Sequence, residues 1–489
     1  MTDSGRILCV DIGTSSLKAA LIDFDGREHA FVRVAYPAKA YIHGILPATA
    51  WEDALSRALD RLFSREQGPI PGSVADGVCI SGNGPTLVPV TSDGETTPPL
   101  HWYDGRVVPL GSGPGPASLF LPHAAWFREH ERELYEKTGQ LFSAQEWLSF
   151  RLGADPVTVL PTAYEPYYWD AAQCSAAGLD IRKFPPFVPL GSIIGRVSAA
   201  AARRFSRGGG LSPGIPIIAG GPDFIMALIG TGALRPGIVC DRAGSSEGIN
   251  VCSAFPIRTG ELRILPHAEA GLWNISGIIP ASGRLFEWYR TLTGQAERGY
   301  EDLLEEITGT DSDSSCPAGA TLFFPDGGVL GNRQSPSILF PAGLPGRAGL
   351  GRAVLEAMGF MVRATLETLT RHGFPVTEMR LSGGQSKSPR WNQLKADITG
   401  CTLLVPEIHD GELAGDAVLG ALALGALAGT PTGPGLSEGS GLTEAAGAMI
   451  RIKERYTPHP HVAPAYTKRY RGYCELRETM GQLISPSPE

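Results

Sequence analysis

The sequence lacks the patterns that mark several common classes of protein. It has no run of basic residues, no Cys-x-x-Cys pair and no apolar stretch approaching the roughly twenty residues that a membrane-spanning helix needs. The 42 basic and 50 acidic residues give a net charge of −8. Because nucleic acids and anionic membranes attract basic clusters, we expect neither as a partner.

The eight cysteines are scattered, and several, such as Cys9, Cys79 and Cys252, lie inside apolar runs. This distribution favours reduced, buried thiols over a disulfide framework. The first residues lead directly into a predicted strand, without the charged and then apolar leader of a secreted protein. These features predict a cytoplasmic protein.

Two catalytic motifs are also missing. No Gly-Lys-Ser or Gly-Lys-Thr occurs, which excludes a Walker-type phosphate loop. His130-Glu131 is not followed by the second histidine of a His-Glu-x-x-His zinc site.

The 62 glycines and 40 prolines in 489 residues suit an α/β protein with many tight turns. A chain of this length has room for roughly two to four domains.

The most informative segment is residues 7–21, where two short apolar runs flank an acid, a glycine and several hydroxyl residues. This pattern predicts two strands joined by a tight loop, in which Gly13 lets backbone N–H groups approach a ligand. Asp11 ends the first strand and can hold a cation, and Lys18 adds a positive charge. Such a set suits a phosphate–metal group, although an ordinary polar hairpin remains the alternative. The loop hydroxyls belong to Thr14, Ser15 and Ser16.

The same pattern returns in residues 238–251, where Gly244, Ser245 and Ser246 again lie between two apolar runs. A duplicated strand–loop–strand unit predicts two related lobes, each offering a phosphate loop to a central cleft. We place the boundary between residues 1–236 and 237–489.

Hydrophobic spacing predicts further elements. Residues 77–81 and 215–223 are predicted to be strands, and residues 123–152 to be helical throughout. Other predicted helices cover residues 50–66, 197–207, 224–232, 351–372 and 415–428, and residues 111–116 form a glycine–proline loop.

Over nearly its whole length the chain resembles the FGGY family of carbohydrate kinases, which share a duplicated actin-like, ribonuclease-H-like α/β fold. Residues 102–106, Trp-Tyr-Asp-Gly-Arg, resemble the sugar-site segment of xylulokinase-like members. The other matching segments, in the family's order, are residues 11–18, 213–223 and 244–246, Gly283 with Trp288, and residues 352–356, 382–384, 391–397 and 419–421.

The resemblance implies an ATP- and Mg²⁺-dependent kinase that phosphorylates a sugar hydroxyl. Asp223 stands in the family's position for the general base, and Asp11 in that of the magnesium-binding acid. Around the phosphates it implies Gly13, Thr14, Ser15, Lys18, Gly244, Ser245 and Ser246. Against the ribose and base it implies Gly283, Gly383, Gly384 and Gln385.

The acceptor site departs from the family's named patterns. Residues 82–86 are Gly-Asn-Gly-Pro-Thr, where xylulokinases usually carry Met-His and glycerol kinases Arg-Glu. The loop within residues 107–125 is also shorter than usual. We expect a ketopentose, D-xylulose before ribulose, with other ketoses, glycerol and other polyols as alternatives. The implied acceptor residues are Asn83, Trp102, Asp104, Arg106 and Asp223.

Two other functions compete with this interpretation. Residues 244–248 fit the Gly-x-Ser-x-Gly motif of serine hydrolases, but the residues after Ser246 favour a strand, whereas a nucleophile elbow needs a helix there. A nucleotide-binding actin-like sensor without transferase activity is the second alternative. The oligomeric state stays open, and a homodimer is one state that the sequence allows.

Overall fold

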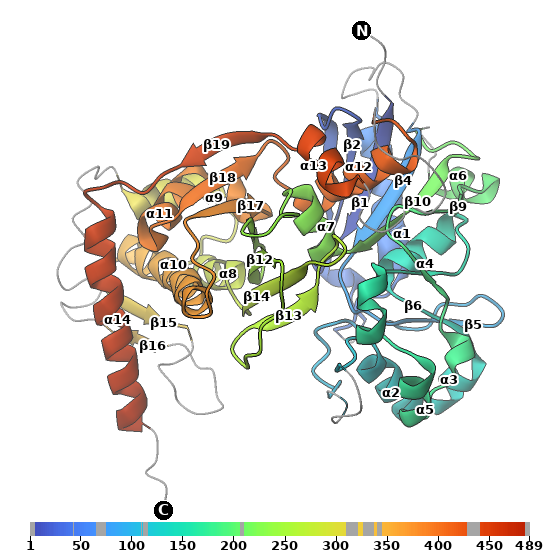
Figure 1. Cartoon of the computed structure of the whole chain (residues 1–489), viewed down its shortest axis with the longest axis horizontal. Helices are drawn as coiled ribbons and strands as arrows, with labels where there is room; N and C mark the ends of the chain where they lie inside the picture. Colours follow the sequence, from blue (N-terminus) through green and yellow to red (C-terminus); the bar gives the residue numbers. More distant parts are fainter. Residues whose placement is uncertain are drawn as a thin grey trace, which may run out of the picture. The chain divides into compact units, whose positions relative to one another are not determined.

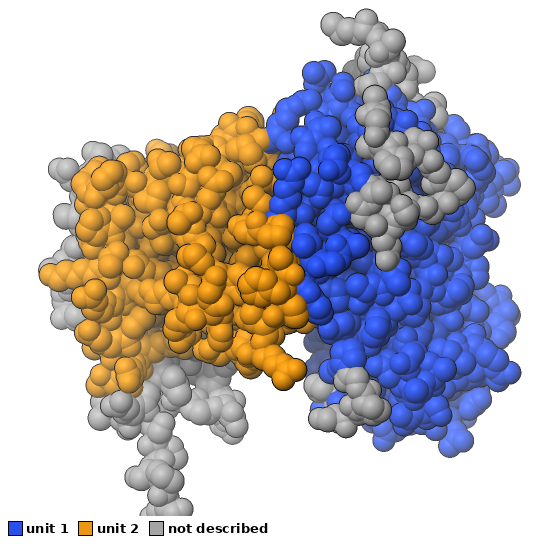
Figure 2. Space-filling model, in the orientation of Figure 1, with its two compact units in different colours: residues 1–235, 265–273, 410–451 blue, residues 236–264, 274–409, 452–489 orange. Residues whose placement is uncertain are grey.

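The chain folds into two compact units, each assembled from separate stretches of sequence (Figure 2). The first contains residues 1–235, 265–273 and 410–451, and the second contains residues 236–264, 274–409 and 452–489. The sequence-based boundary divides the chain once, after residue 236, whereas here residues 410–451 group with the first unit. The computed structural model describes residues 5–42, 44–64, 75–108, 110, 116–205, 210–309, 321–325, 337–339, 345–427 and 441–484, so most of the 111–116 loop lies outside the described residues.

The first unit is built on a six-stranded sheet of order β3-β2-β1-β4-β10-β9 (Figure 1). Strands β1 and β2 form an antiparallel hairpin, and β4 runs parallel to both β1 and β10. All seven residues of β1 are buried, as expected for a strand covered on both faces. The strands are β1 Arg6–Ile12, β2 Ser16–Asp23, β3 Glu28–Ala35, β4 Gly77–Gly82, β9 Ile193–Arg196 and β10 Pro216–Pro222.

The second unit repeats this arrangement in a seven-stranded sheet of order β13-β14-β12-β11-β17-β18-β19. Strands β11 and β12 again form an antiparallel hairpin, and β17 runs parallel to β11 and β18. The predicted duplication is therefore confirmed for six strands in the same order, while β13 has no counterpart in the first sheet. These strands are β11 Val239–Ala243, β12 Glu247–Ser253, β13 Arg263–Pro266, β14 Trp273–Ile279, β17 Glu378–Ser382, β18 Thr402–Pro406 and β19 Ile452–Tyr456.

Helices pack around these sheets, and short strands form three further two-stranded sheets (Figure 1). The helices are α1 Thr49–Leu62, α2 Leu121–His130, α3 Arg132–Lys137, α4 Ala144–Leu152, α5 Ala171–Ala176, α6 Ala199–Phe205, α7 Asp223–Gly230, α8 Gly283–Leu292, α9 Tyr300–Thr308, α10 Arg347–Arg371, α11 Pro389–Thr399, α12 Gly411–Ala423, α13 Leu442–Met449 and α14 Ala463–Ile484. The short strands are β5 Val88–Thr91, β6 Thr138–Phe142, β7 Thr158–Val159, β8 Phe187–Val188, β15 Leu322–Phe324 and β16 Ser337–Leu339.

The prediction of one helical stretch over residues 123–152 is wrong. A strand, β6, separates α3 from α4 and pairs antiparallel with β5. The charge spacing that favoured a helix is local, whereas the hydrogen bonds of β6 come from a segment about fifty residues earlier in the chain, which periodicity does not report.

Helices α7 and α12 of the first unit pack with their backbones in close approach. A Cβ atom added to Gly230 would lie 1.8 Å from the carbonyl oxygen of Gly411, and one added to Gly415 would lie 2.3 Å from that of Met226. Only glycine fits at such distances. These contacts fix the position of α7, which begins at Asp223.

We expect Gly230→Ala to lower the free energy of unfolding by about 1–3 kcal/mol or more, because the methyl group overlaps the backbone of α12. Urea unfolding of both proteins measures the difference. Gly447→Ala is the matched control, since a Cβ atom at Gly447 in α13 meets nothing within 4 Å. The packing argument fails if the two variants unfold at the same urea concentration.

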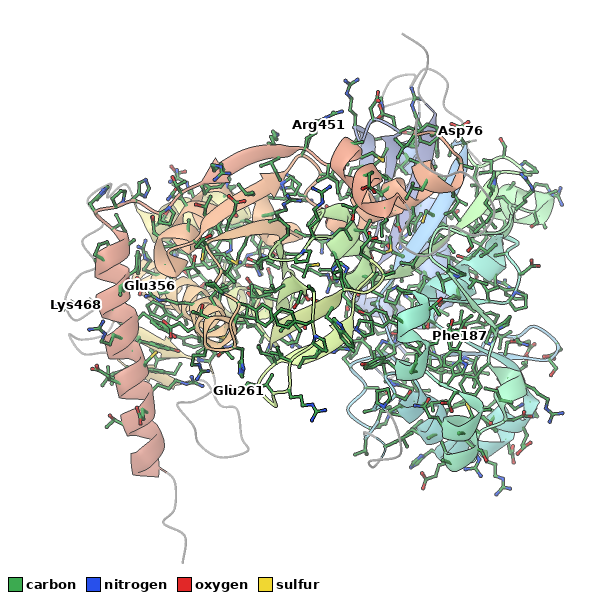
Figure 3. All side chains as sticks on the ribbon, viewed as in Figure 1. Asp76, Phe187, Glu261, Glu356, Arg451 and Lys468 are labelled. Atoms are coloured by element: carbon green, nitrogen blue, oxygen red, sulfur yellow. The ribbon has the colours of Figure 1, made fainter. Side chains whose placement is uncertain are left out.

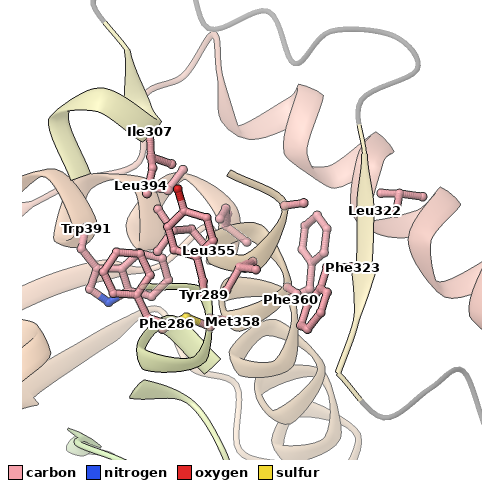
Figure 4. Close-up of a cluster of buried hydrophobic side chains, with 14 of the residues drawn as sticks. Phe286, Tyr289, Ile307, Leu322, Phe323, Leu355, Met358, Phe360, Trp391 and Leu394 are labelled. Carbon is pink, nitrogen blue, oxygen red and sulfur yellow. The ribbon is translucent and has the colours of Figure 1, made fainter. Parts of the chain in front are cut away.

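The core of the second unit gathers aromatic and aliphatic side chains from α8, α10, α11 and β15 (Figure 4). Trp391 of α11, Tyr289 of α8 and Phe360 of α10 are all nearly inaccessible to solvent. Helix α14 adds polar contacts: buried Glu356 of α10, labelled in Figure 3, accepts a 2.7 Å hydrogen bond from Arg469 Nε. This core anchors α8, whose first residue donates to the loop that joins β11 to β12, and α11, whose Trp391 donates to Gln385 beside that loop.

None of the helices in the described ranges combines the length and the apolar character that crossing a bilayer requires.

Candidate active site

The first unit places a lysine between two buried carboxylates at the end of the β1–β2 hairpin. Asp11 lies directly opposite Lys18 across the hairpin, and its Oδ2 is 3.0 Å from Lys18 Nζ. Asp410 comes directly before α12, and its Oδ1 is 3.1 Å from the same nitrogen. The sequence resemblance did not identify Asp410, because Asp410 and Lys18 are far apart in the sequence and come together only in the folded chain.

Burial and the charge of the ion-pair partner shift the pKa in opposite directions, for Asp11 as for Lys18. Burial raises the pKa of Asp11 to about 7, against the lowering effect of Lys18, and Glu412 and Asp223 raise it further. Burial lowers the pKa of Lys18, but Asp11 and Asp410 outweigh it, so the net pKa lies well above its ordinary value. Lys18 is therefore a permanent cation at neutral pH.

Asp223 is the first residue of α7, immediately after β10 ends in Gly220-Gly221-Pro222. Its side chain is partly exposed, and its charge acts on Asp11. A carboxylate in the first turn of a helix is stabilised by the helix dipole. The structure thus brings Asp11, Lys18 and Asp223 into one group in the same unit.

The glycine loop of the first hairpin contacts part of the predicted acceptor segment. Trp102 Nε1 donates to Thr14 Oγ1 over 3.2 Å, and the Trp102 N–H donates to Thr86 Oγ1 over 3.3 Å. The Thr86 hydroxyl in turn donates to Asn83 Oδ1 over 2.9 Å, and the Asn83 N–H donates to the Ile12 carbonyl. Thr14, Asn83 and Trp102 are therefore neighbours, whereas Ser15 lies exposed at the tip of the loop.

Asp104 and Arg106 bond to each other. Arg106 Nε and Nη2 donate to the two carboxylate oxygens of Asp104 over 2.9 and 2.6 Å, which lowers the pKa of Asp104. The guanidinium also lies 4.4 Å from the ring centre of Trp126. The two side chains therefore hold each other in position.

The three glycine segments predicted for the second lobe converge. Residues 244–246 join β11 to β12, and the N–H of Gly283 donates to the Gly244 carbonyl over 3.1 Å. Gln385 Nε2 donates to the same carbonyl over 3.1 Å. Gly244, Ser245 and Gly384 are exposed.

The reason for glycine differs among these positions. A Cβ atom at Gly283 would lie 2.4 Å from the Gly244 carbonyl oxygen, and one at Gly383, where φ is +96°, would lie 2.4 Å from that of Ala243. Both glycines are required by the protein's own backbone. A Cβ atom at Gly384 meets nothing within 4 Å, so that position has open space for a ligand.

Sequence reasoning missed a second lysine, Lys395 of α11, which contacts the carboxylates of Asp241 and Glu247 beside this loop. The lysine lies within the matching segment of residues 391–397, but neither that match nor the helical pattern indicates which acids it meets.

The chain is similar in sequence and structure to known carbohydrate kinases. Residues 242–424 match the C-terminal domain of the FGGY family of carbohydrate kinases. The chain therefore carries the C-terminal domain of that family. It is 24% identical to an autoinducer-2 kinase of Klebsiella pneumoniae, over 94% of this chain and 91% of the relative. It is 23% identical to the xylulose kinase of Bacillus subtilis, over 86% of this chain and 88% of the relative.

The solved structure of xylulose kinase from Rhodospirillum rubrum superposes on this FGGY carbohydrate kinase with a TM-score of 0.75 and 21% identity, covering 98% of this chain and 99% of that one. The likeness confirms the duplicated actin-like α/β fold. The domain match and the names of the relatives indicate a sugar kinase, which is a phosphotransferase with an alcohol acceptor. The serine hydrolase alternative is wrong, because Ser246 is followed directly by strand β12, whereas a nucleophile elbow needs a helix.

Glu146 of this FGGY kinase is a buried acid in α4. Burial raises its pKa to about 7, although the Val159 N–H, which donates to Oε1 over 3.0 Å, lowers it. The native state therefore keeps a proton that the unfolded chain loses above about pH 4.5. Stability is fully present at low pH and falls as the pH rises toward 7.

We expect Glu146→Gln to remove this pH dependence, because the amide is neutral and still accepts from Val159. At about pH 8 the variant gains up to about 3 kcal/mol over the wild type, and at about pH 5 the difference is small. Urea unfolding at the two pH values measures both. Equal pH profiles for the two proteins would contradict the expectation.

Proposed function

We propose that this FGGY kinase transfers the γ-phosphoryl group of ATP to a hydroxyl of a small sugar, with Asp223 as the general base. The observation that carries the proposal is the placement of Asp223. It is partly exposed, begins a helix after a strand-end turn, and lies within electrostatic reach of Asp11 in the same unit.

The chemistry asked of Asp223 is proton removal. As the acceptor oxygen attacks phosphorus, its O–H bond breaks and the proton passes to the carboxylate of Asp223, while the bond from phosphorus to the leaving oxygen of ADP breaks. A negative charge on Asp223 is favourable at this position, because it lies in the first turn of α7 next to the positive end of the helix dipole.

Magnesium fits the donor set around Asp11. Asp11 Oδ1 is buried and has no hydrogen-bond partner among the described residues, while Oδ2 accepts from Lys18. No three acidic, histidine or cysteine side chains of the described part of the chain form a closed metal cage. Mg²⁺ is often held by one carboxylate together with water and substrate phosphates, and when bound it neutralises phosphate charge.

The remaining predicted residues receive the nucleotide. We assign Gly13, Thr14, Ser15 and Lys18 to the phosphates as donors and charge, and we assign residues 244–246 the same role. We assign Gly283, Gly383 and Gln385 to the wall of the nucleotide site. Gly384 has the open space that a flat base or ribose requires.

For the acceptor we propose a ketopentose, D-xylulose before ribulose. Xylulose kinases are among the relatives, and the segment of Trp102, Asp104 and Arg106 matches the xylulokinase-like pattern. Asn83 would bond a sugar hydroxyl, because it lies beside Thr14 and Trp102. Other ketoses, glycerol and other polyols remain alternatives, and autoinducer-2 joins them because relatives bear that name.

The test is ATP consumption, followed by coupled ADP release, against a panel of ketopentoses, other ketoses, polyols, aldoses and autoinducer-2. One acceptor raising turnover well above the background rate supports the proposal and names the substrate. ATP binding without transfer to any member of the panel would favour the sensor instead.

A further inference from the structure

A buried charged group lies beneath the loop of residues 244–246 in the second unit. Lys395 is 1% exposed, and its ammonium contacts the carboxylates of Asp241, which is fully buried, and Glu247, which is 1% exposed. Asp241 and Glu247 share one face of the β11–β12 hairpin, since Glu247 lies opposite Ala243 and Asp241 is two residues before it. The group therefore ties α11 to both strands that carry the loop.

Hydrogen bonds extend this group to the loop. Ser282, the residue before α8, donates its hydroxyl to Glu247 Oε2 over 2.5 Å. The same hydroxyl oxygen accepts from Gln385 Nε2 over 3.0 Å, and that amide nitrogen also donates to the Gly244 carbonyl. Trp391 Nε1, from the same helix as Lys395, donates to Gln385 Oε1 over 3.0 Å.

These bonds hold the loop carbonyls toward the protein. The Gly244 carbonyl accepts from the Gly283 N–H and from Gln385, and the Ser245 carbonyl accepts from the N–H groups of Ser282 and Arg284 over 3.1 and 3.2 Å. A carbonyl oxygen facing an anion is repulsive. A loop whose carbonyls are bound on the protein side is prepared to receive phosphate oxygens.

Burying a charged lysine costs free energy of folding unless ion pairs and hydrogen bonds compensate for the lost contact with water. An apolar side chain would fill the same place in α11, and buried ion pairs are often no more stabilising than apolar residues of the same volume. Burial raises the pKa of Asp241, and neighbouring Glu247 raises it further, while Lys395 lowers it. Lys395 contacts one carboxylate oxygen of Glu247 and Ser282 donates to the other, so Glu247 links the buried lysine to Ser282.

We propose that Lys395 is a positioning residue for nucleotide binding: through Glu247, Ser282 and Gln385 it sets the shape of the loop at residues 244–246. The inference rests on the proposed function, since it takes this loop to bind the nucleotide phosphates. Lys395 acts only through other residues, and nucleotide affinity is the property it controls.

The experiment compares ADP binding by calorimetry, with Mg²⁺ present, for the wild type, Lys395→Met and the control Lys468→Met. Lys468 is an exposed residue of α14, so its substitution makes the same chemical change away from the loop (Figure 3). We expect Lys395→Met to weaken ADP binding at least about tenfold, as loss of one or two charge-supported contacts does, while Lys468→Met binds as the wild type does.

Thermal unfolding of each variant separates this effect from general damage, because a merely structural lysine changes the melting temperature without changing ADP affinity well below it. If Lys395→Met does not fold, Lys395→Met/Glu247→Gln removes one of the two carboxylates left without the lysine and undergoes the same test. Wild-type ADP affinity in a folded Lys395 variant would overturn the inference. A wild type that binds no ADP would overturn the proposed function itself.

Discussion

Asp223→Asn should lower kcat by about 100- to 10,000-fold, because the amide cannot take the proton from the acceptor hydroxyl. Its shape matches that of the carboxylate, so the KM values for ATP and sugar should change little. The measurement is coupled ADP release with the acceptor found in the substrate panel.

The control for this substitution is Asp170→Asn. Asp170 also lies at the start of a helix in the same unit, where it accepts the N–H of Gln173 over 2.7 Å, and asparagine caps helices equally well. Full activity in Asp170→Asn with a large loss in Asp223→Asn assigns the proton transfer to Asp223. More than about a tenth of wild-type kcat in Asp223→Asn would contradict the role of general base.

Lys18→Met should have two effects at once. Loss of the ammonium removes a charge that stabilises the transferring phosphoryl group, and comparable losses lower kcat by about 100- to 1,000-fold. It also leaves Asp11 and Asp410, both nearly buried, without their shared cation, which costs about 3 kcal/mol of unfolding free energy. ADP release and urea unfolding measure the two effects separately.

A double variant distinguishes these effects. Lys18→Met/Asp410→Asn removes one of the two carboxylates that the lysine had neutralised, so it should recover part of the lost stability without recovering activity. Lys39→Met, an exposed lysine of the same unit, should change neither quantity. If the double variant regains kcat, Lys18 serves only to hold the fold together.

The sequence pattern predicted those elements whose hydrogen-bond partners lie close to them in the chain, such as the two hairpins. The two hairpins around Gly13 and Gly244 were predicted because an acid, a glycine and hydroxyl residues interrupt short apolar runs, and the strand ending at Pro222 was predicted from its glycine turn. The repeat of the strand–loop–strand unit predicted two related lobes, and the order of the strands in each sheet came from the structure. The roles of the site residues came from resemblance to a family, which spacing alone does not supply.

The contacts that sequence reasoning missed join residues far apart in the chain. Lys395 and Asp241 are separated by 154 positions, and no periodicity within α11 indicates which acid its lysine meets. Strand β6 was missed because its partner is β5, and Asp410 because Lys18 lies at the other end of the sequence. Glycine at position 283 was predicted to make room for a ligand, whereas the structure also shows the protein's own carbonyl in that space.

The interleaving of the two units has a consequence for biosynthesis. The first unit needs residues 410–451, which include α12 against β1 and β4, and the second needs residues 452–489, which supply β19 and α14. A ribosome that has translated as far as residue 409 has therefore completed neither unit, and the apolar faces of β1 and β4 await a helix not yet made. Folding of this kinase must finish late in translation or after release, during which time the nascent chain offers chaperones an uncovered sheet.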